Sequence, residues 1–222
     1  MSRGQGVALL SAAALAVPLL GAARPGDAPG RNLRARAYEF VGEEGDCGAG
    51  APAGSRIVQA EWLDGLGLPD DGGSARSGLL LSKNGPTADC SAAVARIRGI
   101  AGETIDELGF DYRNGSHCGG GAPRFGVVSR EGFYYFVGCA SGNPEPAPPD
   151  EGQWTRVRFG AGAFVPSSPE APPFELGVTR VDRLYVVFDE GTDATSAGNP
   201  AGSGLAILDN VDVNGELIER GD

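Results

Sequence analysis

The chain has 222 residues, and its 29 Asp and Glu outnumber its 18 Lys and Arg, which gives a net charge of −11. A chain this acidic repels phosphate backbones and anionic membrane surfaces, so its composition argues against nucleic-acid binding and against membrane association through basic patches. Lys83 is the only lysine, whereas Arg, Ala, Gly and Pro are abundant. This usage indicates a GC-rich genome.

The N-terminal segment, residues 1–23, predicts a secretory signal peptide. Arg3 provides a positive start, a small-apolar stretch follows over residues 7–20, and Gly21–Ala23 provides the small residues of a cleavage site. The apolar stretch is too short to span a bilayer and contains Pro18. We therefore expect a secreted, extracellular protein that has no stable membrane insertion after cleavage.

Residues 24–36 lack apolar periodicity, and we expect them to form a flexible N-terminal arm. Residues 37–222 alternate short apolar runs with breaks rich in Gly, Pro, Asp and Asn, a pattern typical of a sandwich or barrel. In chain order, the expected strands are residues 57–63, 78–81, 93–100, 107–112, 124–128, 133–139, 154–159, 183–189 and 205–213. Three Pro-, Gly- and Ser-rich stretches read as surface loops, namely residues 141–152, 161–173 and 191–204.

The clearest strand is Glu107–Tyr112, in which apolar side chains at every second position face one way, and Asn114-Gly115 after it favours a hairpin turn. Residues 87–98 leave two alternatives open, because their alanines also suit a helix; the breaks on either side favour a strand. The sequence as a whole predicts one all-β domain, an antiparallel β-sandwich of jelly-roll type with about nine strands.

Four cysteines follow the expected cleavage site, and an even number in an exported chain predicts two disulfides. If residues 129–132 form the turn between two of the expected strands, the cross-strand partner of Cys139 lies near Ala122. Cys118 lies only a few residues before Ala122, so we expect a Cys118–Cys139 bridge. The remaining pair is then Cys47–Cys90.

His117 is the only histidine, so any Ser-His-Asp or Cys-His mechanism would need it. It precedes Cys118 in a Gly-rich loop and no Gly-x-Ser-x-Gly motif is present, so we expect an exposed loop histidine. Glu103 and Glu107 would stand about 13 Å apart in an extended strand, whereas a retaining glycosidase needs about 5–5.5 Å. These observations favour a protein that is not an enzyme. A glycan-acting hydrolase or lyase that uses acidic residues remains the alternative.

A carboxylate at Asp209 interrupts the apolar face of the strand over residues 205–213, which is costly unless that carboxylate is hydrogen-bonded, paired or bound to a metal. Asp189 and Asp193 close the preceding strand. If the two strands are neighbours, Asp189, Asp193 and Asp209 could bind a structural calcium ion. The alternative for Asp209 is a buried side chain that caps a bulge or loop.

Aromatic side chains are the candidates for sugar stacking, and we select Trp62, Tyr112 and Trp154 as ligand-binding residues. Tyr134 and Tyr135 are also candidates, but they are consecutive in an expected strand. One of the two rings must therefore point away from the face that the other covers.

The C-terminal segment Leu208–Gly215, preceded by the strand Leu184–Phe188 and a long acidic loop, resembles the closing strands of secreted bacterial jelly-roll modules. Galactose-binding-like domains and carbohydrate-binding modules share this ending. The resemblance implies a non-catalytic domain that binds a glycan or another cell-surface component. A purely structural or adhesive surface domain is a further alternative. No sugar-contact residue of such a family can be matched to this sequence.

Overall fold

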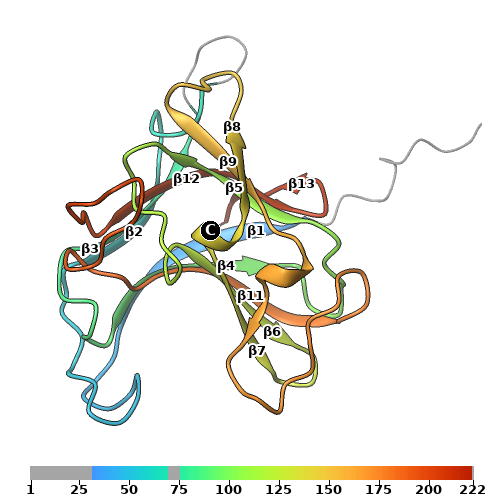
Figure 1. Cartoon of the computed structure of the whole chain (residues 1–222), viewed down its shortest axis with the longest axis horizontal. Coiled ribbons are helices and arrows are strands. Elements are labelled where there is room, and N and C mark those ends of the chain that lie inside the picture. Colours follow the sequence, from blue (N-terminus) through green and yellow to red (C-terminus); the bar gives the residue numbers. More distant parts are fainter. Residues whose placement is uncertain (1–31, 70–75, 222) are drawn as a thin grey trace, which may run out of the picture. The chain divides into compact units, whose positions relative to one another are not determined.

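The structure is a computed structural model, and it describes residues 32–69 and 76–221. These residues form two antiparallel sheets that pack face to face as a β-sandwich (Figure 1). The structure confirms the predicted all-β class and the antiparallel sandwich. The expected signal peptide, residues 1–23, lies outside the described residues, as does most of the expected arm.

Sheet A has the strand order β10-β7-β6-β11-β4-β1-β14. Its strands are β1 (Arg34–Val41), β4 (Ser91–Arg98), β6 (Arg124–Ser129), β7 (Tyr134–Gly138), β10 (Val165–Pro166), β11 (Val181–Phe188) and β14 (Glu219–Arg220). Neighbouring strands run antiparallel, except that the short β14 runs parallel to β1.

Sheet B has the order β2-β3-β12-β5-β9-β8, and β13 also pairs with β12. Its strands are β2 (Val58–Leu63), β3 (Gly78–Lys83), β5 (Leu108–Arg113), β8 (Asn143–Pro146), β9 (Trp154–Arg158), β12 (Leu205–Val213) and β13 (Glu216–Leu217). Two short 3-10 turns complete the assignment, η1 (Cys139–Ser141) and η2 (Ala161–Ala163). No helix in the described parts of the chain is long and apolar enough to cross a membrane.

The core lies between the sheets and follows from the period-two alternation of the strands. β4 points three small or branched residues, Ala93, Ala95 and Ile97, inward, and rings from both sheets fill the remaining space. Phe110 of β5 contacts Phe125 of β6 with ring centroids 5.5 Å apart. Edge-to-face or tilted rings at this distance pack well and fix the spacing of the two layers.

All nine predicted strands are present, and residues 91–98 form strand β4, so the helix alternative for this segment is wrong. β1 begins at Arg34, so the expected flexible arm is wrong for Arg34–Arg36. The first four residues of β1 offer only two alanines, Ala35 and Ala37, between arginines, whereas its second half contains Tyr38 and Phe40. The register with β4 explains why it is nevertheless a strand, because all eight of its residues have a β4 partner.

Both expected disulfides are formed, Cys47–Cys90 and Cys118–Cys139, and no described cysteine is free. β12 contains the bulge that was one alternative for Asp209. The register with β5 shifts between Asp209 and Asp212, and Asn210 has a φ of 45°. Asn tolerates this left-handed conformation better than most residues, so the sequence supports the bulge locally.

Candidate functional site: the outer face of sheet A

Alternation along the strands of sheet A places an aromatic surface on the side that faces away from the core. Strand register sets Tyr38 of β1 opposite Val94 of β4, and Val94 opposite Val187 of β11. Two positions before Val187 on the same strand, Tyr185 lies opposite Gly126 of β6, and Gly126 lies opposite Phe136 of β7. Rings from three strands therefore share one outer face.

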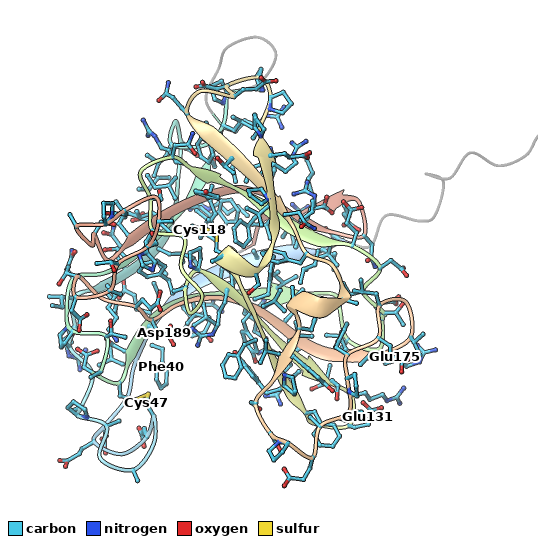
Figure 2. The ribbon with its side chains drawn as sticks, in the orientation of Figure 1. Phe40, Cys47, Cys118, Glu131, Glu175 and Asp189 are labelled. Carbon is cyan, nitrogen blue, oxygen red and sulfur yellow. A yellow bond between two sulfur atoms is a disulfide. The ribbon has the colours of Figure 1, made fainter. Side chains whose placement is uncertain are left out.

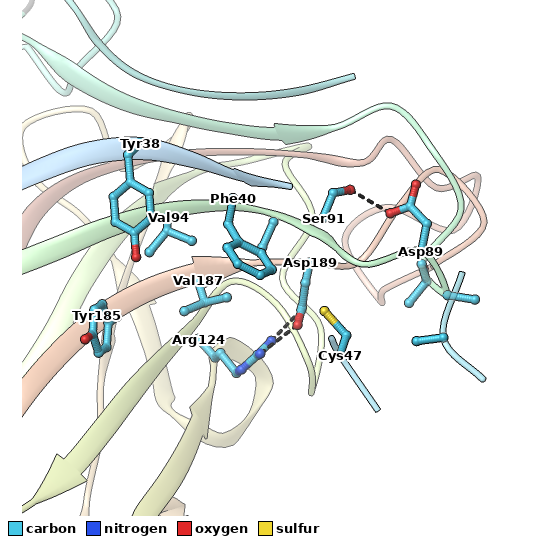
Figure 3. Close-up of a pocket in the computed structure, with 14 residues that line it drawn as sticks. Tyr38, Phe40, Cys47, Asp89, Ser91, Val94, Arg124, Tyr185, Val187 and Asp189 are labelled. Atoms are coloured by element: carbon cyan, nitrogen blue, oxygen red, sulfur yellow. Dashed lines mark hydrogen bonds and ion pairs between the residues drawn. The ribbon is translucent and has the colours of Figure 1, made fainter. Parts of the chain in front are cut away.

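A cavity of about 440 Å³ occupies this face. Tyr38, Phe40 and Tyr185 line it from the sheet, and loop residues Cys47 and Asp89 line it from one end (Figure 3). Figure 2 shows Phe40, Cys47 and Asp189 gathered on one side, away from Glu131 and Glu175.

A second cavity of about 460 Å³ shares Thr87, Arg124 and Asp189 with the first and continues to Phe136 and Val165. We call the two contiguous cavities the sheet A groove.

An ion pair lies where the two cavities meet. The Arg124 guanidinium donates to both carboxylate oxygens of Asp189, with Nη2 2.6 Å from Oδ2, and Nη1 also donates to the Gly121 carbonyl at 2.8 Å. The guanidinium also stacks over the Phe136 ring, 5.3 Å from its centroid. Burial opposes the charge of Arg124, but Asp189 outweighs burial, and the pKa of Arg124 is raised. The groove therefore contains a fixed, charged hydrogen-bonding pair.

Burial raises the pKa of two tyrosines on this face. Burial raises the pKa of Tyr38, Tyr185 adds to the rise, and nearby Arg96 opposes it. Burial also raises the pKa of Tyr134, against the effect of the Arg124 guanidinium beside it. Tyr134 lies across Gly126, where a Cβ would stand 2.1 Å from the Tyr134 hydroxyl. Glycine at this position thus lets a ring cover the sheet.

The loop between β3 and β4 forms one wall of the groove, and a buried cation holds it. The Lys83 ammonium is fully buried and donates to the carbonyls of Thr87, Asp89 and Ser91 at 3.2, 2.9 and 2.9 Å. It also lies 2.9 Å from the Asp89 carboxylate. Burial opposes ionisation of Asp89, but hydrogen bonds from Ser55, Ser91 and Lys83 prevail and hold its pKa well below the usual range.

His117 supports the opposite wall, which the Gly-rich segment Gly119–Gly121 forms. The prediction of an exposed loop histidine is wrong, because His117 is fully buried and its ring packs edge-on against Phe188. Its Nε2 lies 2.5 Å from a carboxylate oxygen of Glu190, and Glu190 in turn lines the second cavity. A Cβ at Gly119 or Gly121 would stand within 2.7 Å of this pair, so glycine is required for the close packing. The local sequence signal, a histidine next to a cysteine and three glycines, did not reveal this partner.

The aromatic residues predicted to bind ligand lie elsewhere. Trp62 is only 7% exposed, and its indole N–H donates to the Ala35 carbonyl at 3.1 Å across the core. Trp154 is 2% exposed in a small separate cluster, and the half-buried Tyr112 packs against the main core. A ligand role for these three residues stays a prediction, and the structure does not bring them together with the sheet A groove.

The three carboxylates predicted to bind calcium have separate protein partners. Asp189 pairs with Arg124, and Asp193 accepts hydrogen bonds from the backbone N–H and hydroxyl of Thr87 at 2.8 and 2.7 Å. Asp209 accepts from the backbone N–H groups of Leu68 and Asn210. In the residues that the structure describes, no three His, Cys, Asp or Glu side chains form a group that could hold a metal ion. Calcium binding stays a prediction.

Comparison with known proteins adds no assignment: no family model, curated protein or solved structure matches this chain. Sequence reasoning missed the rings that line the groove, Tyr38, Phe40, Tyr185 and Phe136. The alternation of β1 and β11 was the signal that could have placed them on one face. Tyr134, which sequence reasoning included among the candidates for stacking, lies over Gly126 on the same face but lines neither cavity.

Proposed function

We propose that this chain is an exported, non-catalytic β-sandwich domain that binds a glycan in the sheet A groove. The observation that carries the proposal is the exposure of its rings. Tyr38, Phe40 and Phe136 are 39%, 40% and 37% exposed, in a chain whose tryptophans are buried. An exposed set of large apolar side chains that lines a hollow is typical of a binding site.

The chemistry of the groove suits a sugar chain. Aromatic rings can stack on the apolar faces of sugars, and the groove presents rings along its length, on β1, β11 and β7. Tyrosine hydroxyls and the Arg124–Asp189 pair provide donors and acceptors for sugar hydroxyls between these rings. The shared lining residues make the two cavities one continuous path.

We also propose that the sandwich is of jelly-roll type. Its support is the path of the chain, which alternates between the sheets through β3, β4, β5 and β6, and again through β9, β11 and β12. Secretion is supported by two disulfides, which persist in oxidising compartments.

The proposal can be tested by electrophoresis through gels that contain soluble polysaccharides. The protein used is residues 24–222, the chain that remains after the expected signal peptide is removed. A ligand retards the protein, and Tyr38→Ala combined with Tyr185→Ala should abolish the retardation because the stacking surface is lost. Ile57→Ala is the control, since Ile57 is 50% exposed and precedes β2 of the other sheet.

Two outcomes would contradict the proposal. Retardation that survives the Tyr38 and Tyr185 substitutions would place binding elsewhere, and Tyr112→Ala would then test the sequence-predicted residues. Release of reducing ends from a retarding polysaccharide would show that the domain is an enzyme, the alternative that the sequence left open.

A further inference from the structure

Four arginines occupy the outer face of sheet A beside the groove. They are Arg36 of β1, Arg96 and Arg98 of β4, and Arg183 of β11, and all four are exposed. Arg36 lies directly opposite Arg96, and Arg96 lies directly opposite the groove residue Tyr185. We call these four residues the arginine patch. Arg36, Arg96 and Arg183 each stand two positions from a residue that lines the groove on the same strand. Residues two positions apart in a strand share one face, so the patch is continuous with the sheet A groove.

Most of the charge of the patch has no ion-pair partner among the described residues. Among the described residues, only Arg183 has a carboxylate partner, the neighbouring Asp182 at 3.1 Å, and both of these side chains are about half exposed. No ion pair joins a described carboxylate to Arg36, Arg96 or Arg98. Like charges placed directly opposite each other across two strands destabilise a sheet.

The outer face of sheet B shows that the chain can neutralise such residues. There Arg156 pairs with Asp111, and Arg158 lies 3.2 Å from Glu107 and 3.3 Å from Asp212. Within the described residues, the arginines of β9 are thus paired with carboxylates, whereas Arg36, Arg96 and Arg98 on the outer face of sheet A have no ion-pair partner. The unmatched face is also the face with the exposed rings.

We propose that the ligand of the sheet A groove is an acidic polysaccharide, whose carboxylate or sulfate groups bind the arginine patch while its sugar rings lie on the aromatic residues. This inference rests on the proposed glycan-binding function and specifies its ligand class. Guanidinium groups suit this role, because their planar donors match the oxygens of a carboxylate or sulfate in pairs. The net charge of −11 repels polyanions in general, so binding requires the rings and arginines to act together.

The test compares matched pairs of polymers at low salt: polygalacturonate with its methyl-esterified form, and dextran sulfate with dextran. We expect binding to at least one acidic polymer, and at least tenfold weaker binding to its neutral counterpart. The first pair tests carboxylate and the second tests sulfate, so their results identify which anion the patch binds.

Variants locate the interaction on the patch. Arg36→Gln combined with Arg96→Gln should weaken binding to the acidic polymer about thirtyfold, or about 2 kcal/mol, if each arginine contributes about 1 kcal/mol near an anionic surface. Arg56→Gln combined with Arg113→Gln is the matched control. It removes the same charge, but beside β2 and at the end of β5 in sheet B, and should change binding less than threefold.

Equal loss of affinity in the two double variants would overturn the inference, because it would indicate a general charge effect. Equal binding to the acidic and neutral polymers would also overturn it, yet would leave the proposed glycan-binding function intact. Patch-dependent binding to duplex DNA or to phosphatidylserine vesicles as tight as to either acidic polymer would likewise refute selectivity for a glycan. Failure of every polysaccharide to bind would refute the proposed function as well.

Discussion

Lys83→Met should destabilise the fold strongly. The ammonium of Lys83 lies within 3.2 Å of four oxygens, the carbonyls of Thr87, Asp89 and Ser91 and the Asp89 carboxylate. Methionine fills most of the volume but leaves a buried carboxylate without its counter-ion. Removing one partner of a buried ion pair costs about 3–5 kcal/mol. Folded domains have total stabilities of about 5–15 kcal/mol, so this loss is a large fraction of the whole.

Urea denaturation at pH 7, followed by far-ultraviolet circular dichroism, measures this loss. A domain of this size should also melt about 6–20 °C lower, at about 2–4 °C per kcal/mol. Arg56→Met is the control, since it removes one exposed positive charge and should change the free energy of unfolding by about 0.5 kcal/mol or less. A loss below about 1 kcal/mol in Lys83→Met would refute the reasoning, because the contacts of the Lys83 ammonium would then contribute little net stability.

The ion pair between Lys83 and Asp89 also predicts a pH dependence of stability. The pKa of Asp89 is lowered in the folded state, so the stability it contributes is fully present above its unfolded value of about 3.9. That stability is lost progressively as the pH falls below this value toward the folded pKa. Asp89→Asn should therefore flatten the decline of the free energy of unfolding between about pH 4 and pH 2. An identical decline in both proteins would show that other carboxylates control acid unfolding.

Two further sets of substitutions test the supports of the groove walls. Replacing both cysteines of Cys118–Cys139 by alanine should cost about 3 kcal/mol, and of Cys47–Cys90 about 4 kcal/mol, because the second bridge closes the longer loop, with a sequence separation of 43 against 21. Denaturation in urea checks the order, and a reversed order would mean that loop entropy is not the main cause. Gly191→Ala should destabilise by about 1–3 kcal/mol, because its Cβ would stand 1.8 Å from the Gly85 carbonyl oxygen. Gly160→Ala, which meets nothing within 4 Å, should be close to neutral, and equal losses in the two variants would contradict the steric explanation.

Local rules of the sequence predicted those parts of the fold that local chemistry determines. The Cys118–Cys139 pair was expected from the length of one turn. The structure places Cys139 beside Pro123, with its N–H 2.9 Å from the Pro123 carbonyl, one residue from the expected position. The alternation in Glu107–Tyr112 likewise predicted strand β5 correctly, because one face of that strand is buried in the core.

Elements held by their partners were not predictable in this way. The first half of β1 alternates arginines with alanines and carries no large apolar residue, so its strand conformation depends on pairing with β4 along its full length. β8 and β10 formed within the predicted loops over residues 141–152 and 161–173, and each pairs with a longer strand, β9 or β7. A segment with only two to four paired residues has no periodicity of its own to recognise.

The site was harder to predict than the fold because the sequence does not distinguish an aromatic residue in the core from one on the surface. Tyr134 and Tyr135 illustrate the difficulty, since the sequence requires opposite directions for them but does not say which ring faces out. The structure buries Tyr135, whose hydroxyl donates to the Pro172 carbonyl, and leaves Tyr134 over Gly126. Gly126, which is registered opposite Phe136, leaves the space that the Tyr134 ring occupies on the outer face.

The calcium ion predicted at Asp189, Asp193 and Asp209 stays a prediction, and the structure shows a different cation, the Lys83 ammonium, near the acidic loop after β11. Thr87 accepts a hydrogen bond from the Gly191 N–H and donates to Asp193, while its carbonyl accepts from Lys83. The ammonium thereby ties the β3–β4 loop, and through Thr87 the acidic loop, to the end of the sandwich. Its charge is used within the fold, whereas the arginine patch on the same sheet remains available to a ligand.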